Sequence, residues 1–189
     1  TDHTGREYLD FSSQLVNVNL GHQHPDLVAA IAEAAGRMTT MAPGFAVETR
    51  SQAAAMIADR APGDLDAVFF TNGGADANEH AIRMARLHTG RHKVLAAYRS
   101  YHGGTAGAMA LTGEPRRWGS EPSLPGIVHH WGPYPYRSPF HSDSPEQECE
   151  RALAHLREVI EVEGPQHVAA IVLETVVGTN GVLVPPDGY

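Results

Sequence analysis

The sequence predicts an α/β fold built on a largely parallel β-sheet, and three observations support this. Short apolar segments alternate with segments of helical periodicity along most of the chain. Those apolar segments are nearly continuous, as in strands that are buried on both faces. Three of them run directly into a polar or glycine-rich cluster, which is typical of the carboxyl edge of a parallel sheet, where ligands bind.

The first part of the chain predicts a small N-terminal segment. A turn at residues 4–6 followed by the alternating run EYLDFSS predicts a hairpin. The apolar spacing over residues 27–38 predicts a helix, with Pro25 near its start, where a missing N–H costs little. The run MAPGF then interrupts the pattern. We therefore assign residues 1–46 to an N-terminal segment and residues 47–189 to a larger domain.

The larger domain is expected to alternate helices with strands. It begins with a helix from about Glu48 to the stop at Pro62-Gly63, followed by a strand AVFF and a helix from about Ala75 to Thr89 that is closed by Gly90. A strand KVLAAY and an Ala/Met-rich segment come next, and then a loop-rich tract from Thr112 to about Ser144 with one short strand GIVHH. The last elements are a helix PEQECERALAHLREVIEVEG and a strand HVAAIVLE.

Composition limits the classes of partner. The net charge of −8 argues against a surface for nucleic acid or anionic membrane, since both require Lys and Arg. No stretch is long and apolar enough to cross a membrane, and the N-terminus lacks the apolar core of a signal peptide. The single cysteine, Cys149, cannot form an internal disulfide, which favours a reducing compartment. We expect a cytoplasmic protein.

The first polar cluster, Thr71-Asn72-Gly73-Gly74-Ala75, lies between the strand AVFF and a helix. Backbone N–H groups at a helix start have no intrahelical partner, and the helix dipole adds positive charge there. The two glycines allow close approach, so the turn is a candidate phosphate cradle without being a Walker loop or a G-x-G-x-x-G motif. The alternative is an ordinary helix start capped by Asn72 and Asp76.

The other two clusters follow the strands KVLAAY and HVAAIVLE. In the second cluster Tyr101 either stacks on a planar ligand or fills a gap between helices, and His102 is either an acid/base group or a structural hydrogen-bonding residue. In the third cluster Glu174 places a carboxylate at the sheet edge. Because an unpaired charge there is costly, a neighbouring Arg or a ligand cation is implied.

Two further motifs do not predict a site. His22, His24, His129 and His130 lack the Cys or carboxylate neighbours and the spacing of a zinc site, so no metal site is predicted. Ser12 and Ser13 lie outside any G-x-S-x-G sequence, so neither is a candidate nucleophile.

Four stretches together carry a resemblance to a known family. They are GREYLDFSSQLVNVNLGHQHPDLVAAI, FFTNGGADANEHAIRMAR, YRSYHGGT and VAAIVLETVVGTNGVLVPPDGY. In this order they resemble the class III (ω-amino acid) aminotransferases, which are pyridoxal-phosphate enzymes of fold type I. The second stretch resembles the family's cofactor motif, and the fourth resembles its E-P-x-x-G-x-x-G-x-x-x-P-P-x-G-Y block. The resemblance covers essentially the whole chain and implies pyridoxal 5'-phosphate, an incomplete large domain and a homodimer with shared active sites.

The resemblance also implies roles for individual residues. Gly73, Gly74 and Ala75 would hold the cofactor phosphate through backbone N–H groups, Tyr101 would lie over the pyridine ring with His102 in the same motif, Glu174 would sit near the cofactor's hydroxyl side, and Leu15 and Phe45 resemble positions lining the substrate pocket. Many relatives carry Ser at the Ala75 position, so one hydroxyl contact is lost here.

Two departures from the family pattern concern the residues after Glu174. Thr175 replaces the usual Pro, which the turn should tolerate. Thr179 stands where γ-aminobutyrate- and ornithine-type members carry a Glu that pairs with a switching Arg. Its absence argues against glutamate/2-oxoglutarate exchange. The wording of ETVVGTNG and SSQLVNVNLGH looks closer to members that pass the amino group of taurine, β-alanine or simple amines to pyruvate.

The family chemistry requires a Schiff-base lysine and an Asp against the pyridinium nitrogen. The only lysine, Lys93, opens the strand KVLAAY at the end opposite the predicted site. We therefore expect the catalytic lysine beyond Tyr189 and expect the chain alone to be inactive. The alternatives are a decarboxylase or aminomutase of the same fold, a non-catalytic relative that binds a phosphorylated ligand, and a nucleotide-binding α/β domain, which the missing glycine motifs disfavour.

Overall fold

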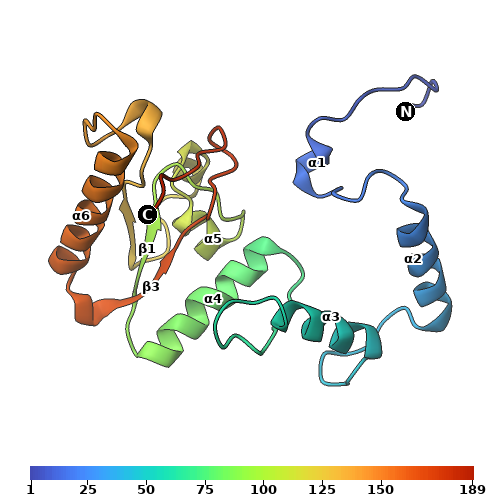
Figure 1. The fold of residues 1–189 in the computed structure, drawn as a ribbon. Coiled ribbons are helices and arrows are strands. Elements are labelled where there is room, and N and C mark those ends of the chain that lie inside the picture. Colours follow the sequence, from blue (N-terminus) through green and yellow to red (C-terminus); the bar gives the residue numbers. More distant parts are fainter. The chain divides into compact units, whose positions relative to one another are not determined.

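The computed structural model describes residues 1–189 and divides them into two compact units, Thr1–Val68 and Phe69–Tyr189 (Figure 1). The sequence-based boundary at residues 46 and 47 falls within the first of these units.

The first unit contains three helices, and two of them are the predicted ones. They are α1 (Ser13–Val16), α2 (Pro25–Arg37) and α3 (Glu48–Ala58). In α2 a proline occupies the first turn, and the Asp26 carboxylate lies in the same turn, where the helix dipole favours negative charge. The helix predicted over residues 27–38 is therefore confirmed with a shift of its boundaries, and α3 begins at the predicted Glu48.

The hairpin predicted near the N-terminus is only half present. The turn forms, with the Gly5 N–H donating to the Asp2 carbonyl and the Asp2 N–H donating to the Arg6 carbonyl. The run EYLDFSS is not a strand, so that prediction is wrong. A strand requires a hydrogen-bonded neighbour, and none pairs with this run, whose Leu9 side chain is exposed.

The second unit is built on a three-stranded parallel sheet. Its strands are β1 (Lys93–Ala97), β2 (Ile127–His130) and β3 (Val168–Val172), in the order β2-β1-β3. Both neighbours of β1 are parallel to it. All three strands were predicted, and residues 94–97 of the central β1 form an uninterrupted apolar run because helices cover both faces of the sheet.

Helices cover the two faces of this sheet. In Figure 1, α6 (Pro145–Glu163) lies on one side of the strands, and α4 (Gly74–Thr89) and α5 (Ala106–Leu111) lie on the other. Short 3₁₀ helices complete the connections at η1 (Pro115–Ser120), η2 (Pro135–Arg137) and η3 (Pro165–His167). Gly90 ends α4 in the left-handed conformation with φ 68°, as predicted for a glycine C-cap. The layers confirm the α/β class and its parallel sheet.

The expected strand AVFF is wrong for this structure. Residues 67–70 are not assigned to any strand, and Phe69 and Phe70 are 63% and 43% exposed. Aromatic side chains favour strands only where a neighbouring strand and a packed face receive them, and neither is present within the chain. The turn that follows nevertheless leads into α4 as predicted.

The core of the second unit lies between the sheet and α4 and α5. Its buried cluster consists of Ile82, Val94, Ala96 and Leu111, with Ile127, Ala169, Ala170 and Val172 packed against it. Small side chains dominate α5, which allows that helix to approach the sheet closely. The chain contains no helix of the length and apolarity required to span a membrane.

Candidate functional site

The N-terminus of α4 presents free backbone donors. The N–H groups of Gly74 and Ala75 have no hydrogen-bond acceptor within the chain, since the first bond of the helix runs from the Ala77 N–H to the Gly73 carbonyl. A Cβ at Gly73 or Gly74 would meet no protein atom within 4 Å, so the space beside them is open. These donors and the helix dipole suit an anionic group such as a phosphate.

Two carboxylates near the start of α4 bind other groups of the chain and not the free N–H groups. Asp76 accepts from the Asn72 N–H at 3.2 Å and lies 3.6 Å from the His80 ring nitrogen. Glu79 accepts from the N–H groups of Gly107 at 2.6 Å and Ala108 at 3.3 Å, at the start of α5. Burial raises the pKa of Glu79, but hydrogen bonds from Thr105 and from these two N–H groups outweigh it, so the net shift is downward.

The loop after β1 packs directly on the start of α4. Gly103 has φ +131°, and a Cβ at this position would lie 2.5 Å from the Ala75 Cβ. The Asn78 side-chain amide donates to the His102 carbonyl at 2.7 Å. These contacts bring the first two predicted clusters together, although one of the strands expected to precede them is absent.

His102 is a buried, structurally engaged residue. Its N–H donates to the Thr112 hydroxyl at 3.1 Å, and the residue is 8% exposed. Burial lowers the pKa of the imidazole, against an opposing effect from Glu174, so the neutral form is favoured. Its Nε2 is buried without a partner within the chain. Both hydrogen bonds are made by the backbone of His102, so both roles of its imidazole stay predictions.

Glu174 connects the third cluster to the second. One carboxylate oxygen accepts from the Tyr101 N–H at 2.9 Å, and the other accepts from the Gly178 N–H at 3.0 Å. No arginine pairs with this carboxylate within the chain, and two backbone N–H groups take that place, so the neighbouring Arg was predicted wrongly and the ligand cation stays a prediction. Hydrogen bonds from backbone donors stabilise the charged form of a carboxylate. All three predicted clusters thus meet at the carboxyl edge of the sheet.

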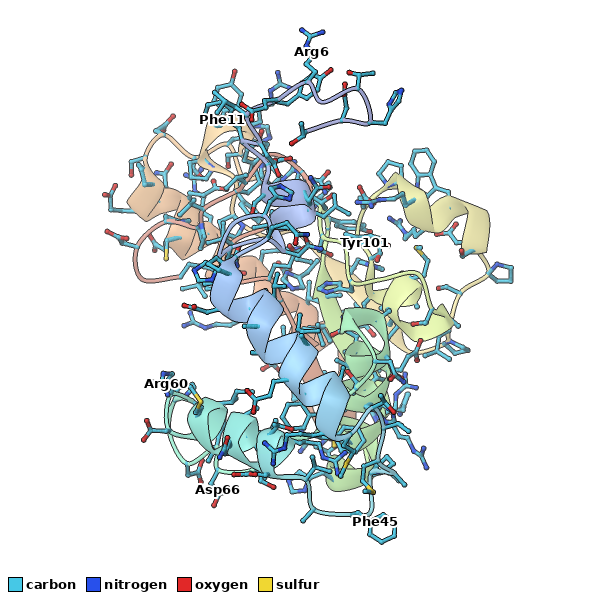
Figure 2. The ribbon with its side chains drawn as sticks, turned by 90° about the vertical axis from the view of Figure 1, so that its right-hand side faces the viewer. Arg6, Phe11, Phe45, Arg60, Asp66 and Tyr101 are labelled. Carbon is cyan, nitrogen blue, oxygen red and sulfur yellow. The ribbon has the colours of Figure 1, made fainter.

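Tyr101 carries a cation on its ring that the sequence analysis did not identify. The Arg116 guanidinium carbon lies 3.8 Å from the Tyr101 ring centroid, and its Nη2 donates to the Thr179 hydroxyl at 2.6 Å. The same guanidinium hydrogen-bonds the Glu114 carboxylate. Figure 2 labels Tyr101 in the loop that follows β1. Arg116 was missed because it lies in the loop-rich tract, where no periodicity indicates which side chains meet the site.

A cavity of about 310 Å³ lies beside Glu174, at the carboxyl ends of β1 and β3. Its lining includes Arg99, Ser100, Leu173, Leu183 and Tyr189. This is the lower end of the size range for small-molecule pockets, and its position follows the rule for parallel sheets.

The remaining sequence-based candidates lie outside this cluster. Leu15 and Phe45 belong to the first unit and are 90% and 65% exposed, and the Phe45 side chain extends outward from its loop (Figure 2). Their roles stay predictions. Lys93 begins β1 and binds the Glu163 carboxylate at 2.6 Å, at the opposite end of the strand from Tyr101. No group of three potential metal-ligating side chains is present.

Comparison with known proteins identifies the family. The family model described as "Aminotransferase class-III" matches residues 1–189. The chain belongs to the class-III aminotransferases. This confirms the predicted family and its fold type, and class-III aminotransferases use pyridoxal phosphate as their cofactor.

Individual relatives fit the same assignment. The chain is 35% identical to alanine–glyoxylate aminotransferase 2 homolog 2, mitochondrial, of Arabidopsis thaliana, covering 100% of this chain and 38% of that protein. It is 36% identical to an acetylornithine aminotransferase of Halalkalibacterium halodurans, covering 98% of this chain and 43% of that protein. The chain therefore spans about two fifths of the length of the curated relatives it matches.

Solved structures agree with the fold. A taurine:2-oxoglutarate aminotransferase from Bifidobacterium kashiwanohense, in complex with pyridoxal phosphate and glutamate, matches 100% of this chain and 43% of its own with a TM-score of 0.94 and 47% identity. An (S)-enantioselective ω-transaminase from Thermomicrobium roseum matches 96% of this chain and 42% of its own with a TM-score of 0.90 and 39% identity.

The residues present fit the family's cofactor. The phosphate requires donors at a helix start, and the Gly74 and Ala75 N–H groups are unpartnered there beside open space. An aromatic face suits a planar ring, and Tyr101 lies in the adjoining loop with its backbone held by Glu174. Arg116 covers one face of the Tyr101 ring, so the cofactor would lie against the other.

Proposed function

We propose that the protein is a transaminase that moves an amino group from an ω-amino acid or amine to a keto acid through pyridoxal phosphate. The observation that carries this proposal is the convergence of three polar clusters at one edge of the sheet. Glu174 bonds the Tyr101 N–H across 73 positions of sequence, and Gly103 packs on Ala75. A site that only capped a helix would not require these long-range contacts.

Each residue of this site has a defined task in the proposal. Gly74 and Ala75 would donate to the cofactor phosphate, Tyr101 would lie against the ring, and Glu174 holds Tyr101 through its backbone N–H. When bound, pyridoxal phosphate supplies an electron sink for negative charge at the substrate carbon that carries the amino group. His102 lies in the same loop, where its backbone N–H donates to the Thr112 hydroxyl and burial lowers the pKa of its imidazole.

The proposed chemistry needs a lysine that the site in this chain does not supply. Lys93 is held by the carboxylate and the carbonyl of Glu163 at the far end of β1. We therefore propose that the covalent link to the cofactor is made by a lysine outside residues 1–189, and that residues 1–189 alone do not transaminate. A decarboxylase or aminomutase would share this requirement, and its reaction products would differ.

The keto acid we propose is pyruvate, because Thr179 stands where glutamate-using members carry an acidic residue. A second acceptor, 2-oxoglutarate, is favoured by the 47% identity to a taurine:2-oxoglutarate aminotransferase. The two acceptors are distinguished by the rate at which each keto acid regenerates the aldehyde form of the cofactor in a single turnover, measured by the absorbance of the cofactor. A faster reaction with 2-oxoglutarate at equal concentration would contradict the pyruvate proposal.

We also propose a cytoplasmic homodimer with shared active sites. The apolar side chains of Leu27, Val28 and Ile31 on α2 are 45–60% exposed within the first unit, so a partner surface would bury them. Light scattering of the protein from its natural source gives the mass in solution. A monomeric mass at micromolar concentration would contradict the dimer.

The experiment that tests the function is chemical mapping of the cofactor link. The protein from its natural source is reduced with borohydride, digested and searched by mass spectrometry for phosphopyridoxyl-lysine. A label on a lysine outside residues 1–189 supports the enzyme. A source protein that carries no label, or carries it only on Lys93, contradicts the enzyme and leaves a non-catalytic phosphate-binding relative.

A further inference from the structure

The turn between β1 and Tyr101 passes through an arginine in an unfavourable backbone conformation. Arg99 has φ +66°, in the left-handed region that glycine adopts freely and that residues with a side chain rarely adopt. The Arg99 N–H donates to the Gly113 carbonyl at 2.9 Å, and the Asn180 side-chain amide donates to the Arg99 carbonyl at 2.8 Å. Since glycine would fit this backbone without strain, we expect the arginine side chain to make a compensating contact.

That contact is made with two aromatic rings. The Arg99 guanidinium carbon lies 4.8 Å from the Trp131 ring centroid and 4.6 Å from the Tyr134 ring centroid. A guanidinium is weakly hydrated and stacks on aromatic faces, so both contacts are favourable. Burial lowers the pKa of Arg99, against opposing effects from Tyr134 and Glu148. The side chain thus ties the turn after β1 to the loop after β2.

The loop that carries these rings is itself held by a buried carboxylate that the proposed chemistry does not use. Glu148 of α6 is 0% exposed, and its Oε1 accepts from the Tyr134 N–H at 2.6 Å. Its Oε2 accepts from the hydroxyl groups of Ser138 and Ser142. Because all three donors lie within residues 134–142, the carboxylate joins this loop to α6. Tyr134, which receives the guanidinium on its ring, is therefore anchored through its backbone.

Only one residue separates Arg99 from Tyr101. That residue, Ser100, is 1% exposed, and its hydroxyl donates to the Ala97 carbonyl at 2.6 Å, so the connection is short and firmly held. We propose that Arg99 is a positioning residue: its guanidinium, held on two aromatic rings, fixes the turn after β1 and thereby the position of the Tyr101 ring against the cofactor. This inference rests on the proposed function, because it takes the Tyr101 ring as the face that the cofactor meets.

The test measures binding of pyridoxamine 5'-phosphate, which has the ring and phosphate of the cofactor and forms no covalent link to a lysine. Its Kd is measured by calorimetry on the cofactor-free protein from the natural source. R99N removes the guanidinium, and asparagine tolerates the left-handed conformation. The Kd rises in R99N by about 3- to 10-fold, the size of a lost aromatic contact. R99K keeps the charge without the planar group and gives a smaller rise.

Tyr101 is the residue through which Arg99 acts, and a second variant checks this. In a Y101A background, R99N changes the Kd by less than about 2-fold, because two changes that remove the same contact are not additive. R137Q is the matched control, since the Arg137 guanidinium also lies over a ring, that of the exposed Tyr136, at 5.5 Å, and it leaves the Kd unchanged. An equal effect of R99N with and without the Tyr101 ring would overturn the inference.

Amide hydrogen exchange separates this inference from the proposed function, because it needs neither cofactor nor turnover. In the cofactor-free protein, exchange over residues 99–104 is faster in R99N by roughly 3-fold or more, while exchange over β1 is unchanged. Should R99N fail to fold, N180A removes the donor to the Arg99 carbonyl and carries the same expectation. Unchanged exchange over residues 99–104 would overturn the inference. Failure of the original protein to bind pyridoxamine 5'-phosphate contradicts the proposed function alone.

Discussion

At the scale of single residues, two adjacent glycines illustrate how differently the same residue type is used. Gly103 has φ +131°, and an added Cβ would lie 2.5 Å from the Cβ and 2.8 Å from the Cα of Ala75. Gly104 has no atom within 4 Å of an added Cβ. The close approach of the loop to the start of α4 therefore depends on Gly103, and Gly104 is free of this constraint.

We expect G103A to destabilise the protein by roughly 2–4 kcal/mol, because the new methyl group clashes with Ala75 and alanine is strained at this φ. The neighbouring G104A should change the free energy of unfolding by less than about 0.5 kcal/mol. Urea denaturation of the two variants measures both values. Equal stability of the two variants would show that the loop is free to move away from Ala75.

At the scale of elements, α5 receives its N-terminal cap from a different helix. Its own N-cap residue, Thr105, makes no side-chain cap hydrogen bond to the helix. The Glu79 carboxylate, from α4, accepts the N–H groups of Gly107 and Ala108 instead. Gly107 leaves room for it, since a Cβ there would lie 2.9 Å from the Glu79 Cδ. One carboxylate thus caps α5 and joins it to α4.

We expect E79A to lower the free energy of unfolding by about 1–2 kcal/mol at neutral pH, because two N–H groups lose their acceptor. E79Q keeps an acceptor oxygen and should lose less. The pKa of Glu79 is lowered in the folded protein, so its contribution is present above the ordinary value of 4.5 and is lost as the pH falls through the folded value.

Denaturation curves at pH 7 and pH 3.5 check this expectation. The difference in free energy of unfolding between the original protein and E79A should be smaller at pH 3.5 than at pH 7. An equal difference at both pH values would indicate that lost packing, and not the charged cap, accounts for the lower stability of E79A. Asp76 provides the comparison on the same helix, because its carboxylate contacts the Asn72 N–H and the His80 ring and not another helix.

At the scale of the whole molecule, three histidines of the second unit lie around the sheet, with His102 and His130 buried and His129 half-buried. Burial is the main cause that lowers the pKa of each. His130 is 1% exposed, and its Nε2 has no partner within the chain. The titratable groups nearest to these rings include Glu174 beside His102, Arg117 and Glu121 near His129, and His155 beside His130.

Stability should therefore fall as the pH drops below the ordinary histidine value of 6.5. In that range the unfolded chain takes up protons that the folded chain does not, so the unfolded state gains free energy of protonation. Each group adds up to about 1.4 kcal/mol per pH unit. H130Q should reduce the slope of the unfolding free energy against pH between pH 5 and 6.5. The control is H88Q, which changes an exposed histidine. An equal slope in both variants would contradict the conclusion that His130 contributes to this pH dependence.

Much of the fold could be predicted because its signals are local. The helix α2 follows from apolar spacing, α3, α4 and α6 follow from proline and glycine near their ends, and the three strands follow from apolar runs. The predictions of strands at EYLDFSS and AVFF were wrong for a non-local reason. A strand exists only where a second strand pairs with it, and the sequence of the run itself does not contain that information.

For the candidate site, too, the sequence predicted individual residues but not the contacts between distant ones. Gly74, Tyr101 and Glu174 were identified because each follows a predicted strand or stands at a helix start in a family motif. The backbone N–H partners of Glu174 were not predicted, and Arg116 was missed. Both depend on which loops the sheet order brings together, across 73 positions for Glu174 and 63 for Arg116.

By itself, then, the sequence determined the α/β class, the family and the residues at the strand ends, since periodicity, turn chemistry and motif order are all written within short stretches of chain. Only the tertiary structure decided that Glu174 is paired by backbone N–H groups, that Glu79 caps α5, and that Arg116 lies on Tyr101. The physical reason is that hydrogen bonds and cation–π contacts act over a few ångströms. The parallel sheet, with its order β2-β1-β3, sets which distant residues come that close.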